Sequence, residues 1–392
     1  MSSTGEMGPG PAITVTGAAV IPGGGAVTAG NAAQTWTERR GVLLRLTDEL
    51  GHVGWGEASP LPGFSRDSLD QCRGELEQLD WPDEAIDVPR AWHLAERVAS
   101  PAARFAAESA LFDLLGQRVG RPMAALLAHH RHERETVVPL NALLGDLDRL
   151  QQDAAAAHAR GIRAFKIKVG RPERFSDELD ALSALRQRYG EDIVLRLDAN
   201  RIWPPAVAYE RLAALAEYAP AYIEEPTYDL RSMIKGGKRP AIPIALDESL
   251  VHLDPDADSD EFDSVGPDGP TIKLMHDVMS DLMLRCHVRV LVLKPMLLGG
   301  LRACMEWADI ARRFRAVPVV SHLLGGPVEL AACAQLALAI AGEHACGLDR
   351  HAGLAAWPKA DLAAVGACAV SWTDVPGLGL TLRSEPGDRE SQ

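Results

Sequence analysis

Hydrophobic residues change their spacing along the chain near residue 137. From there on, short runs rich in branched hydrophobic residues alternate with longer stretches of helical spacing at 146–160, 177–189 and 205–218. The short runs have the length and composition of buried strands. The strands that we expect are Val137–Leu140, Ala164–Lys168, Val194–Asp198, Ala221–Glu224, Ile244–Asp247, Val290–Lys294, Val317–Ser321 and Ala345–Asp349.

Eight strands separated by helices are typical of a closed parallel (β/α)-barrel. The alternative architecture is an open doubly wound sheet, in which a glycine-rich phosphate loop often follows an early strand. The sequence contains neither a GxGxxG nor a GxxxxGK[ST] motif. We therefore predict an α/β protein with a (β/α)-barrel as its main domain.

Two segments fall outside this alternation. The first third of the chain mixes strand patterns, at Val42–Leu46 and His52–Glu57, with alanine-rich helical patterns near 68–79 and 101–115. Residues 1–11 lack the basic start and apolar run of a signal peptide, so we expect a flexible tail there. The acidic insertion at 254–280 does not fit the spacing of an EF-hand, and we interpret it as a surface loop.

Composition narrows the choice of partners. The chain of 392 residues carries a formal net charge of −14, which argues against nucleic acid or an anionic membrane surface. No stretch approaches the roughly 20 apolar residues of a membrane span. The six cysteines show no metal-binding spacing, so we expect reduced thiols in a cytoplasmic protein. A small-molecule substrate is the expected partner, and the sequence leaves the oligomeric state open.

Charged residues fall at the ends of successive predicted strands. A barrel enzyme has its active site at the carboxyl ends of its strands. Burying one carboxylate there costs several kcal/mol unless an ion or a partner compensates for it. Three carboxylates on consecutive strands, with lysines on the strands to either side, therefore indicate a shared site. In chain order the residues are Lys166, Lys168, Asp198, Glu224, Asp247 and Lys294.

A magnesium ion would compensate for these carboxylates. Mg²⁺ prefers hard oxygen ligands and keeps open positions for substrate oxygens, whereas no Cys or His joins the series. Side chains alternate along a strand, so only one of Glu224 and Glu225 faces the barrel interior. We take Glu224 and Asp247 as ligands together with Asp198, and Mn²⁺ as an alternative ion. Glu225 and Glu248 are then supporting partners.

The lysine pair is suited to removing a proton. Lys166 and Lys168 lie two residues apart on one strand, so they face the same way with Cα atoms about 6.5–7 Å apart. Repulsion of about 2 kcal/mol between their ammonium groups lowers one pKa by roughly one to two units. Lys294 is expected across the barrel. This arrangement fits abstraction of a proton beside a carboxylate, with Mg²⁺ holding the resulting enediolate.

The combined motif resembles the enolase superfamily, specifically its muconate-lactonizing subgroup. The matching segments, in order, are Lys166-Ile-Lys168, Asp198-Ala-Asn200, Glu224-Glu225-Pro226, Asp247-Glu248-Ser249 and Lys294-Pro295. The resemblance implies that Lys168 is the base, that Lys294 is the stabilising cation, and that Asp198, Glu224 and Asp247 bind the metal. Lys166, Asn200, Glu248 and Ser321 are expected to contact the substrate or to support these groups.

The segment Gly54–Ser65 is most similar to the o-succinylbenzoate synthase family. That resemblance implies dehydration of a cyclohexadiene carboxylate to 2-succinylbenzoate in menaquinone biosynthesis. It also implies a capping domain from residues 1–132, a barrel at 133–355, and a C-terminal segment at 356–392 that returns to the cap. N-succinylamino acid racemase and dipeptide epimerase, which use the same ligands, stay open as alternatives, as does a non-catalytic barrel.

The predicted seventh strand is followed by an unusual segment, Ser321-His-Leu-Leu-Gly-Gly326. The family often has a serine-rich segment there, so recognition of the substrate tail is expected to differ. His322 is either a contact to a substrate carboxylate or a structural residue. Gly325 and Gly326 either present backbone N–H groups to an anion or form an ordinary loop.

Overall fold

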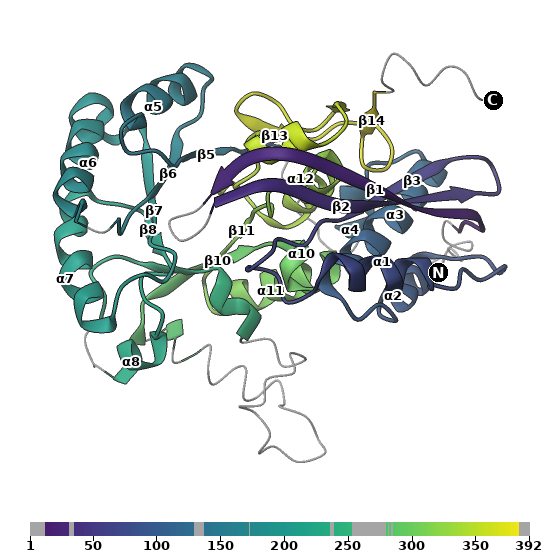
Figure 1. Ribbon diagram of the computed structural model, residues 1–392, viewed down its shortest axis with the longest axis horizontal. Helices are drawn as coiled ribbons and strands as arrows, with labels where there is room; N and C mark the ends of the chain where they lie inside the picture. The colour runs from purple at the N-terminus through teal and green to yellow at the C-terminus, as the bar shows by residue number, and fades with distance from the viewer. Residues whose placement is uncertain are drawn as a thin grey trace, which may run out of the picture.

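Figure 1 shows a computed structural model of the chain. It describes residues 12–30, 35–128, 137–171, 173–235, 239–252, 280, 282–283 and 285–383. The predicted tail at 1–11 lies outside these residues, and so does the predicted acidic insertion, apart from Ser280.

The described residues form a parallel sheet of seven strands in the order β11-β10-β9-β8-β7-β6-β5. Nearly every strand position is buried, as expected where helices cover the outer face and side chains fill the interior. The strands are β5 (Asn141–Leu144), β6 (Ala164–Lys168), β7 (Val194–Asp198), β8 (Tyr222–Glu224), β9 (Ile244–Leu246), β10 (Val288–Leu293) and β11 (Val317–Val320).

Helices lie around this sheet and follow its strands along the chain (Figure 1). Helix α12 is buried at all of its positions, in keeping with a sequence that is apolar except for Glu329 and Gln335. No helix in the described part of the chain is long and apolar enough to span a membrane. The helices are α5 (Leu150–Ala159), α6 (Phe175–Tyr189), α7 (Pro205–Leu215), α8 (Leu230–Lys235), α10 (Pro295–Leu298), α11 (Leu301–Arg313) and α12 (Pro327–Ile340).

The predicted eighth strand, 345–349, closes the ring through two isolated bridges. Cys346 bridges in parallel to Leu140 beside β5, and Gly347 bridges in parallel to Ser321 at the end of β11. The N–H group of Gly347 donates to the carbonyl of Val320 at 2.9 Å. The segment therefore lies between the first and last strands of the sheet, and the predicted (β/α)-barrel is confirmed.

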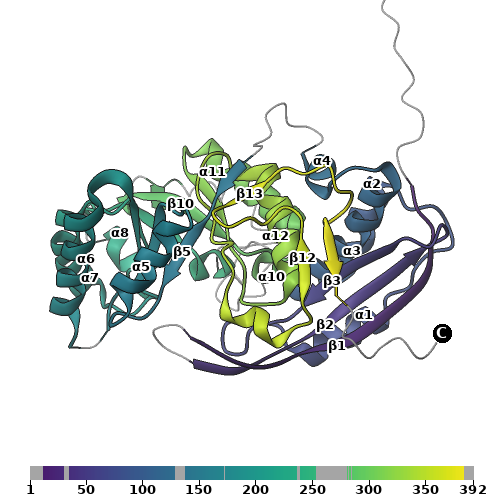
Figure 2. The same ribbon diagram turned by 90° about the horizontal axis from the view of Figure 1, so that it is seen from above.

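A second layer covers one end of the barrel (Figures 1 and 2). Its antiparallel sheet consists of β1 (Val15–Gly30), β2 (Thr35–Asp48) and β3 (Val53–Ala58), and we call this layer the cap. Gly54 and Gly56 let β3 approach α3 closely, because a Cβ on Gly56 would lie 1.9 Å from the carbonyl oxygen of Ala106. The cap helices are α1 (Leu69–Glu77), α2 (Val88–Ala95), α3 (Pro101–Val119) and α4 (Met123–Leu127).

The C-terminal segment runs back along the molecule. Strand β12 (Ala360–Leu362) pairs with β14 (Leu380–Leu382), and β13 (Ala369–Ser371) pairs with β4 (Val137–Pro139). Gly377 then donates its N–H group to the carbonyl of Arg121, just beyond α3. The division of the chain at 132 and 355 stays a prediction.

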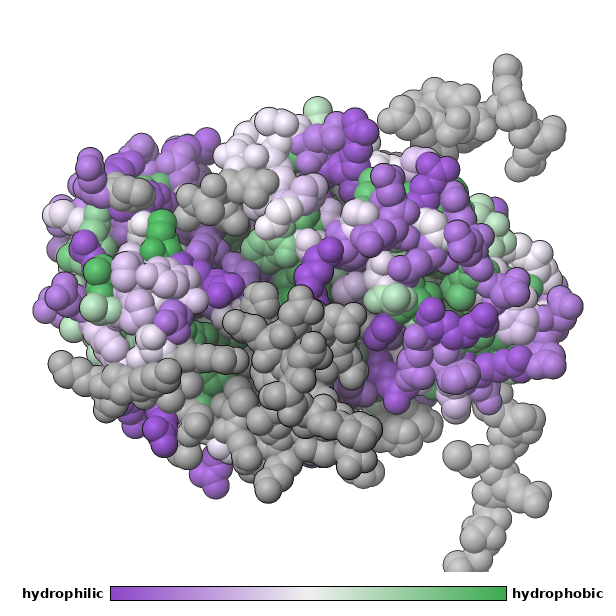
Figure 3. Space-filling view, turned by 60° about the horizontal axis from the view of Figure 1, so that its bottom comes forward, coloured by the Kyte–Doolittle hydropathy of each residue, from purple (hydrophilic) through white to green (hydrophobic). Residues whose placement is uncertain are grey.

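Cap and barrel also share a buried carboxylate. Glu108 on α3 accepts hydrogen bonds from the N–H groups of Leu301 and Arg302 in the first turn of α11. Burial raises the pKa of Glu108 to about 8. The outer surface is different, because hydrophilic residues cover most of the described face in Figure 3 and hydrophobic residues appear there in separate small patches.

Candidate active site

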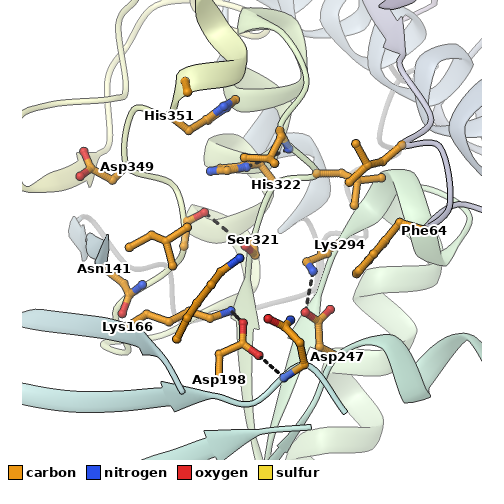
Figure 4. Close-up of a pocket in the computed structure, with 18 of the residues that line it drawn as sticks. Phe64, Asn141, Lys166, Asp198, Asp247, Lys294, Ser321, His322, Asp349 and His351 are labelled. Carbon is orange, nitrogen blue, oxygen red and sulfur yellow. Dashed lines mark hydrogen bonds and ion pairs between the residues drawn. The ribbon is translucent and has the colours of Figure 1, made fainter. Parts of the chain in front are cut away.

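The predicted charged residues meet at the carboxyl ends of the barrel strands (Figure 4). Lys168 on β6 pairs in register with Asp198 on β7, and Asp198 pairs in register with Glu224 on β8. Asp247 directly follows β9, and Lys294 directly follows β10. We call Asp198, Glu224 and Asp247 the mouth cluster. All three are buried, with 2–3% of each residue exposed.

Lysines neutralise the mouth cluster. Lys166 lies between Asp198, at 3.0 Å, and Glu224, with which it also forms an ion pair. The Nζ atom of Lys294 lies 2.5 Å from Oδ2 of Asp247. Burial alone would lower the pKa of Lys166, but attraction to the three carboxylates outweighs it and raises the pKa well above its ordinary value.

The oxygen atoms at the mouth fit a hard divalent cation. Oδ1 of Asp247, Oε2 of Glu248 and Oδ1 of Asn200 are buried and have no hydrogen-bond partner within the described ranges. Within the same ranges no three Asp, Glu, His or Cys side chains are arranged to hold a metal ion as they stand. Lys166 and Lys294 instead form ion pairs with the carboxylates. The donor set suits Mg²⁺, provided that the ammonium groups move aside.

Glu225, which directly follows Glu224 in the sequence, supports the backbone around Asp247. Its carboxylate accepts hydrogen bonds from the N–H groups of Asp247 and Ser249, both at 2.8 Å, and from the hydroxyl of Ser249. Asn200 donates its backbone N–H group to Asp198 at 3.0 Å. These contacts fix the backbone on which the mouth cluster is carried.

Lys168 lies beside the cluster and is 8% exposed. Burial lowers the pKa of Lys168 to about 8, and repulsion from Lys166 and Lys294 acts in the same direction. Repulsion between the two lysines of β6 is therefore the smaller cause, although the sequence suggested it as the main one. Burial in the barrel mouth brings this amine closer to the neutral form that a general base needs.

A cavity of about 380 Å³ opens over these residues. The predicted residues Lys166, Lys168, Asp198, Asn200, Asp247, Glu248, Lys294 and Ser321 line it. Glu224 does not line the cavity, but it forms an ion pair with Lys166, which does. The structure thus brings every predicted site residue to one place, while their chemical roles stay predictions.

The cap contributes an apolar wall to the cavity. Trp36, Leu61 and Phe64 line it from this side. The centre of the Phe64 ring lies 4.8 Å from Nζ of Lys294, which is within the range of a cation–π interaction. Trp36 donates its indole N–H group to the carbonyl of Pro62 at 3.0 Å and so holds this wall in place.

The end of the cavity near β11 is polar. The rings of His322 and His351 stack there, with their centres 3.9 Å apart (Figure 4). Burial lowers the pKa of both, to about 3 for His351, so both imidazoles are neutral at pH 7. Asp349, also on this side, forms a two-point ion pair with Arg160, one N–O distance being 2.9 Å.

Gly325 and Gly326 do present their N–H groups to anions, but these anions belong to the chain itself. Gly325 donates to Glu329 at 2.6 Å, and Gly326 donates to Glu57 at 2.5 Å. His322 is likewise engaged with the protein, because its Nδ1 atom accepts from the N–H group of Leu324 at 3.1 Å. The structure therefore assigns these groups to holding the loop.

Sequence reasoning missed several residues that line the cavity. Asn141 begins β5, one position beyond the predicted first strand, and His351 lies two positions beyond the predicted eighth. Both would have been found by also considering the two residues that follow each predicted strand, because the active site of a barrel lies at the carboxyl ends of its strands. Trp36 offered no such signal, because it comes from the cap.

Fold and site together define a capped (β/α)-barrel whose strand ends carry lysines and carboxylates. Residues 149–257 and 276–386, more than half of the chain, match the family described as enolase C-terminal domain-like. Residues 29–111 match the family described as MenC, N-terminal domain. The chain therefore belongs to the enolase superfamily of enzymes, as its motifs predicted.

Individual relatives differ in their activities. The chain is 27% identical to an o-succinylbenzoate synthase of Desulfotalea psychrophila, over 78% of this chain and 85% of the relative. It is 30% identical to a hydrophobic dipeptide epimerase of Roseobacter litoralis, over 72% and 83%. A dipeptide epimerase from Methylococcus capsulatus, solved with Mg and the dipeptide L-Arg-D-Lys, shares the fold, with a TM-score of 0.75 and 23% identity over 94% of this chain and 99% of that one.

Proposed function

We propose that this protein is a Mg²⁺-dependent enzyme that removes a proton beside a carboxylate, and that it acts as an o-succinylbenzoate synthase. The observation that carries the first part is the pairing of a buried lysine of lowered pKa, Lys168, with the mouth cluster in one cavity. Asp198, Glu224 and Asp247 would hold the ion. When bound, it would stabilise negative charge on the substrate carboxylate as the proton leaves.

The reaction assigned to this chain is the loss of water. Lys168 takes the proton from the carbon beside the carboxylate, and the electron pair of that C–H bond forms the new ring double bond. The neighbouring C–O bond breaks, and the hydroxyl group leaves as water after Lys168 gives it the same proton. The ring becomes aromatic, while the ammonium group of Lys294 balances the charge that develops on the carboxylate.

The choice of a succinyl tail rests on the polar end of the cavity. An ammonium group of a dipeptide substrate calls for a carboxylate partner, but the carboxylate of Asp349 is already paired with Arg160. The neutral His351, whose ring nitrogens have no partner within the described residues, and Arg350 beside it suit a carboxylate or carbonyl oxygen better. The MenC match of residues 29–111 supports the same choice.

Racemisation of N-succinylamino acids is the second candidate. It uses the same tail, and it needs a lysine on each side of the reacting carbon, which Lys168 and Lys294 offer. Epimerisation of hydrophobic dipeptides is the third, on the strength of the relative in Roseobacter litoralis.

One set of assays separates these activities. The purified protein is incubated with Mg²⁺ and, separately, with the cyclohexadiene precursor, an N-succinylamino acid and a hydrophobic dipeptide. We expect 2-succinylbenzoate from the first, detected by its aromatic absorbance. Racemisation of either other substrate without any 2-succinylbenzoate would overturn the proposed synthase.

A further inference from the structure

The loop at residues 323–326, which we call the wall loop, forms one side of the cavity through Leu323 and Leu324. Buried side chains form hydrogen bonds with most of the polar groups of its backbone. Glu329, at the start of α12, accepts hydrogen bonds from the N–H groups of Leu323 at 2.7 Å and Gly325 at 2.6 Å. The loop is therefore fixed from the barrel side by one buried carboxylate.

A second carboxylate reaches the wall loop from the cap. Glu57, at the end of β3, accepts from the N–H group of Gly326 at 2.5 Å and from that of Glu329 at 3.0 Å. The hydroxyl of Ser59 donates to it at 2.7 Å. We call Glu57 and Glu329 the junction pair, and neither residue is measurably exposed.

Arg39 on β2 completes the arrangement and is also fully buried. Its guanidinium donates to the carbonyls of Leu324 at 2.9 Å and Leu323 at 3.3 Å in the wall loop. The same group donates to the carbonyls of Ser59 at 2.6 Å and Pro60 at 3.2 Å in the cap. One side chain thus ties together two segments that are far apart in the sequence.

The cap segment that Arg39 holds leads directly into the other wall of the cavity. Leu61 and Phe64 follow Ser59 and Pro60, and Phe64 covers Lys294. The wall loop packs so closely against Glu57 that there is no room for a side chain at Gly325, because a Cβ there would lie 2.6 Å from Oε1 of Glu57. Arg39 and Glu57 do not themselves line the cavity.

We propose that Arg39 and Glu57 are positioning residues that hold the cap wall and the wall loop as one rigid frame around the substrate tail. They act through Leu323, Leu324 and Phe64 and touch neither the metal ligands nor Lys168. The part of this inference that concerns the substrate rests on the proposed function. The part that concerns the loop does not.

Amide hydrogen exchange of the peptide 321–329, followed by mass spectrometry, tests the loop directly. Glu57→Gln keeps the size of the side chain but leaves one acceptor oxygen. In the wild type, the N–H groups of Gly326 and Glu329 donate to two different oxygens of Glu57. We expect the amides of Gly326 and Glu329 to exchange at least tenfold faster in this variant. Arg45→Met, which changes an exposed arginine on the same strand β2, is the matched control for Arg39→Met and should leave exchange unchanged.

Steady-state kinetics tests the consequence for the substrate. In Arg39→Met and Glu57→Gln we expect KM to rise about tenfold while kcat changes less than threefold, because the wall loop loosens and Lys168 does not move. If Arg39→Met does not fold, Ser59→Ala, which removes a single hydrogen bond to Glu57, should show a smaller rise in KM and faster exchange at Gly326.

The outcomes separate the two claims. Exchange at 321–329 equal to that of the control would overturn the proposed frame, and so would faster exchange with an unchanged KM. A wild-type protein that turns over none of the candidate substrates would instead contradict the proposed function. In that case the exchange measurement still decides whether Arg39 and Glu57 hold the wall loop.

Discussion

The mouth cluster and the junction pair are both groups of buried carboxylates, but their charges are balanced in different ways. At the mouth, Asp198, Glu224 and Asp247 face the ammonium groups of two lysines, and one oxygen of Asp247 has no partner in the described part of the chain. At the junction, Glu57 and Glu329 accept hydrogen bonds mainly from backbone N–H groups that cannot move away.

This difference indicates what each group of carboxylates is for. Lysine side chains can turn aside, and the proposed function requires the mouth cluster to exchange an ammonium group for a metal ion. Backbone donors in a packed loop cannot, so the junction pair fixes the shape of the cavity. Burial alone therefore does not mark a catalytic carboxylate, and the nature of its partner is the better guide.

The largest effect should come from the base at the mouth. Replacing Lys168 with Ala removes the proposed general base, and general-base catalysis contributes roughly 10²–10⁴-fold to a rate. We expect proton exchange at the carbon beside the substrate carboxylate to fall about 10³-fold, measured as deuterium uptake by NMR. Lys359→Ala, at an exposed lysine, is the control. Exchange that persists in Lys168→Ala would show that another residue is the base.

A structural carboxylate should instead affect stability as the pH changes. The folded pKa of Glu108, about 8, lies above its ordinary value of 4.5, so its contribution to stability is complete below pH 4.5 and is lost as the pH rises through 8. Glu108→Gln should reduce the difference in unfolding free energy between pH 5 and pH 9 by up to about 4 kcal/mol.

Urea unfolding at both pH values measures this difference. Glu306→Gln, at an exposed position on α11, serves as the control and should keep the wild-type pH dependence. A Glu108→Gln protein with the same pH dependence as wild type would mean that Glu108 is not the group that titrates.

The smallest effect is expected where the cap meets the mouth. Phe64→Leu keeps an apolar wall but removes the ring that faces Lys294, an interaction of about 1 kcal/mol. We expect kcat/KM to fall roughly fivefold. Phe64→Tyr keeps the ring and should stay close to wild type. Equal values for the leucine and tyrosine variants would argue that the ring itself contributes nothing.

The sequence predicted the barrel and the mouth well, for a local reason. Strand periodicity places a residue such as Asp198 or Lys294 at a strand end without any knowledge of its neighbours, and parallel strands bring those ends together. The eighth strand was also predicted, and within the described residues it is joined to Leu140 and Ser321 by two isolated bridges, at Cys346 and Gly347.

The cap and the wall loop were much less predictable. Strand β1 is rich in Gly and Ala and shows no alternation, since it is held mainly by pairing with β2. The contact of Arg39 with Leu324 spans 285 residues of sequence, and no local pattern encodes it. A buried arginine or glutamate on a strand gives no sign in the sequence of the partner that will neutralise it.

Mg²⁺ binding by calorimetry tests most directly the claim that the mouth cluster is the metal site and the junction pair is structural. Wild type, Asp247→Asn and Glu57→Gln are titrated with Mg²⁺ under identical conditions. We predict one ion per chain in wild type and in Glu57→Gln with similar affinity, and affinity at least tenfold weaker in Asp247→Asn. Unchanged Mg²⁺ binding in Asp247→Asn, or an equal loss in Glu57→Gln, would contradict the account.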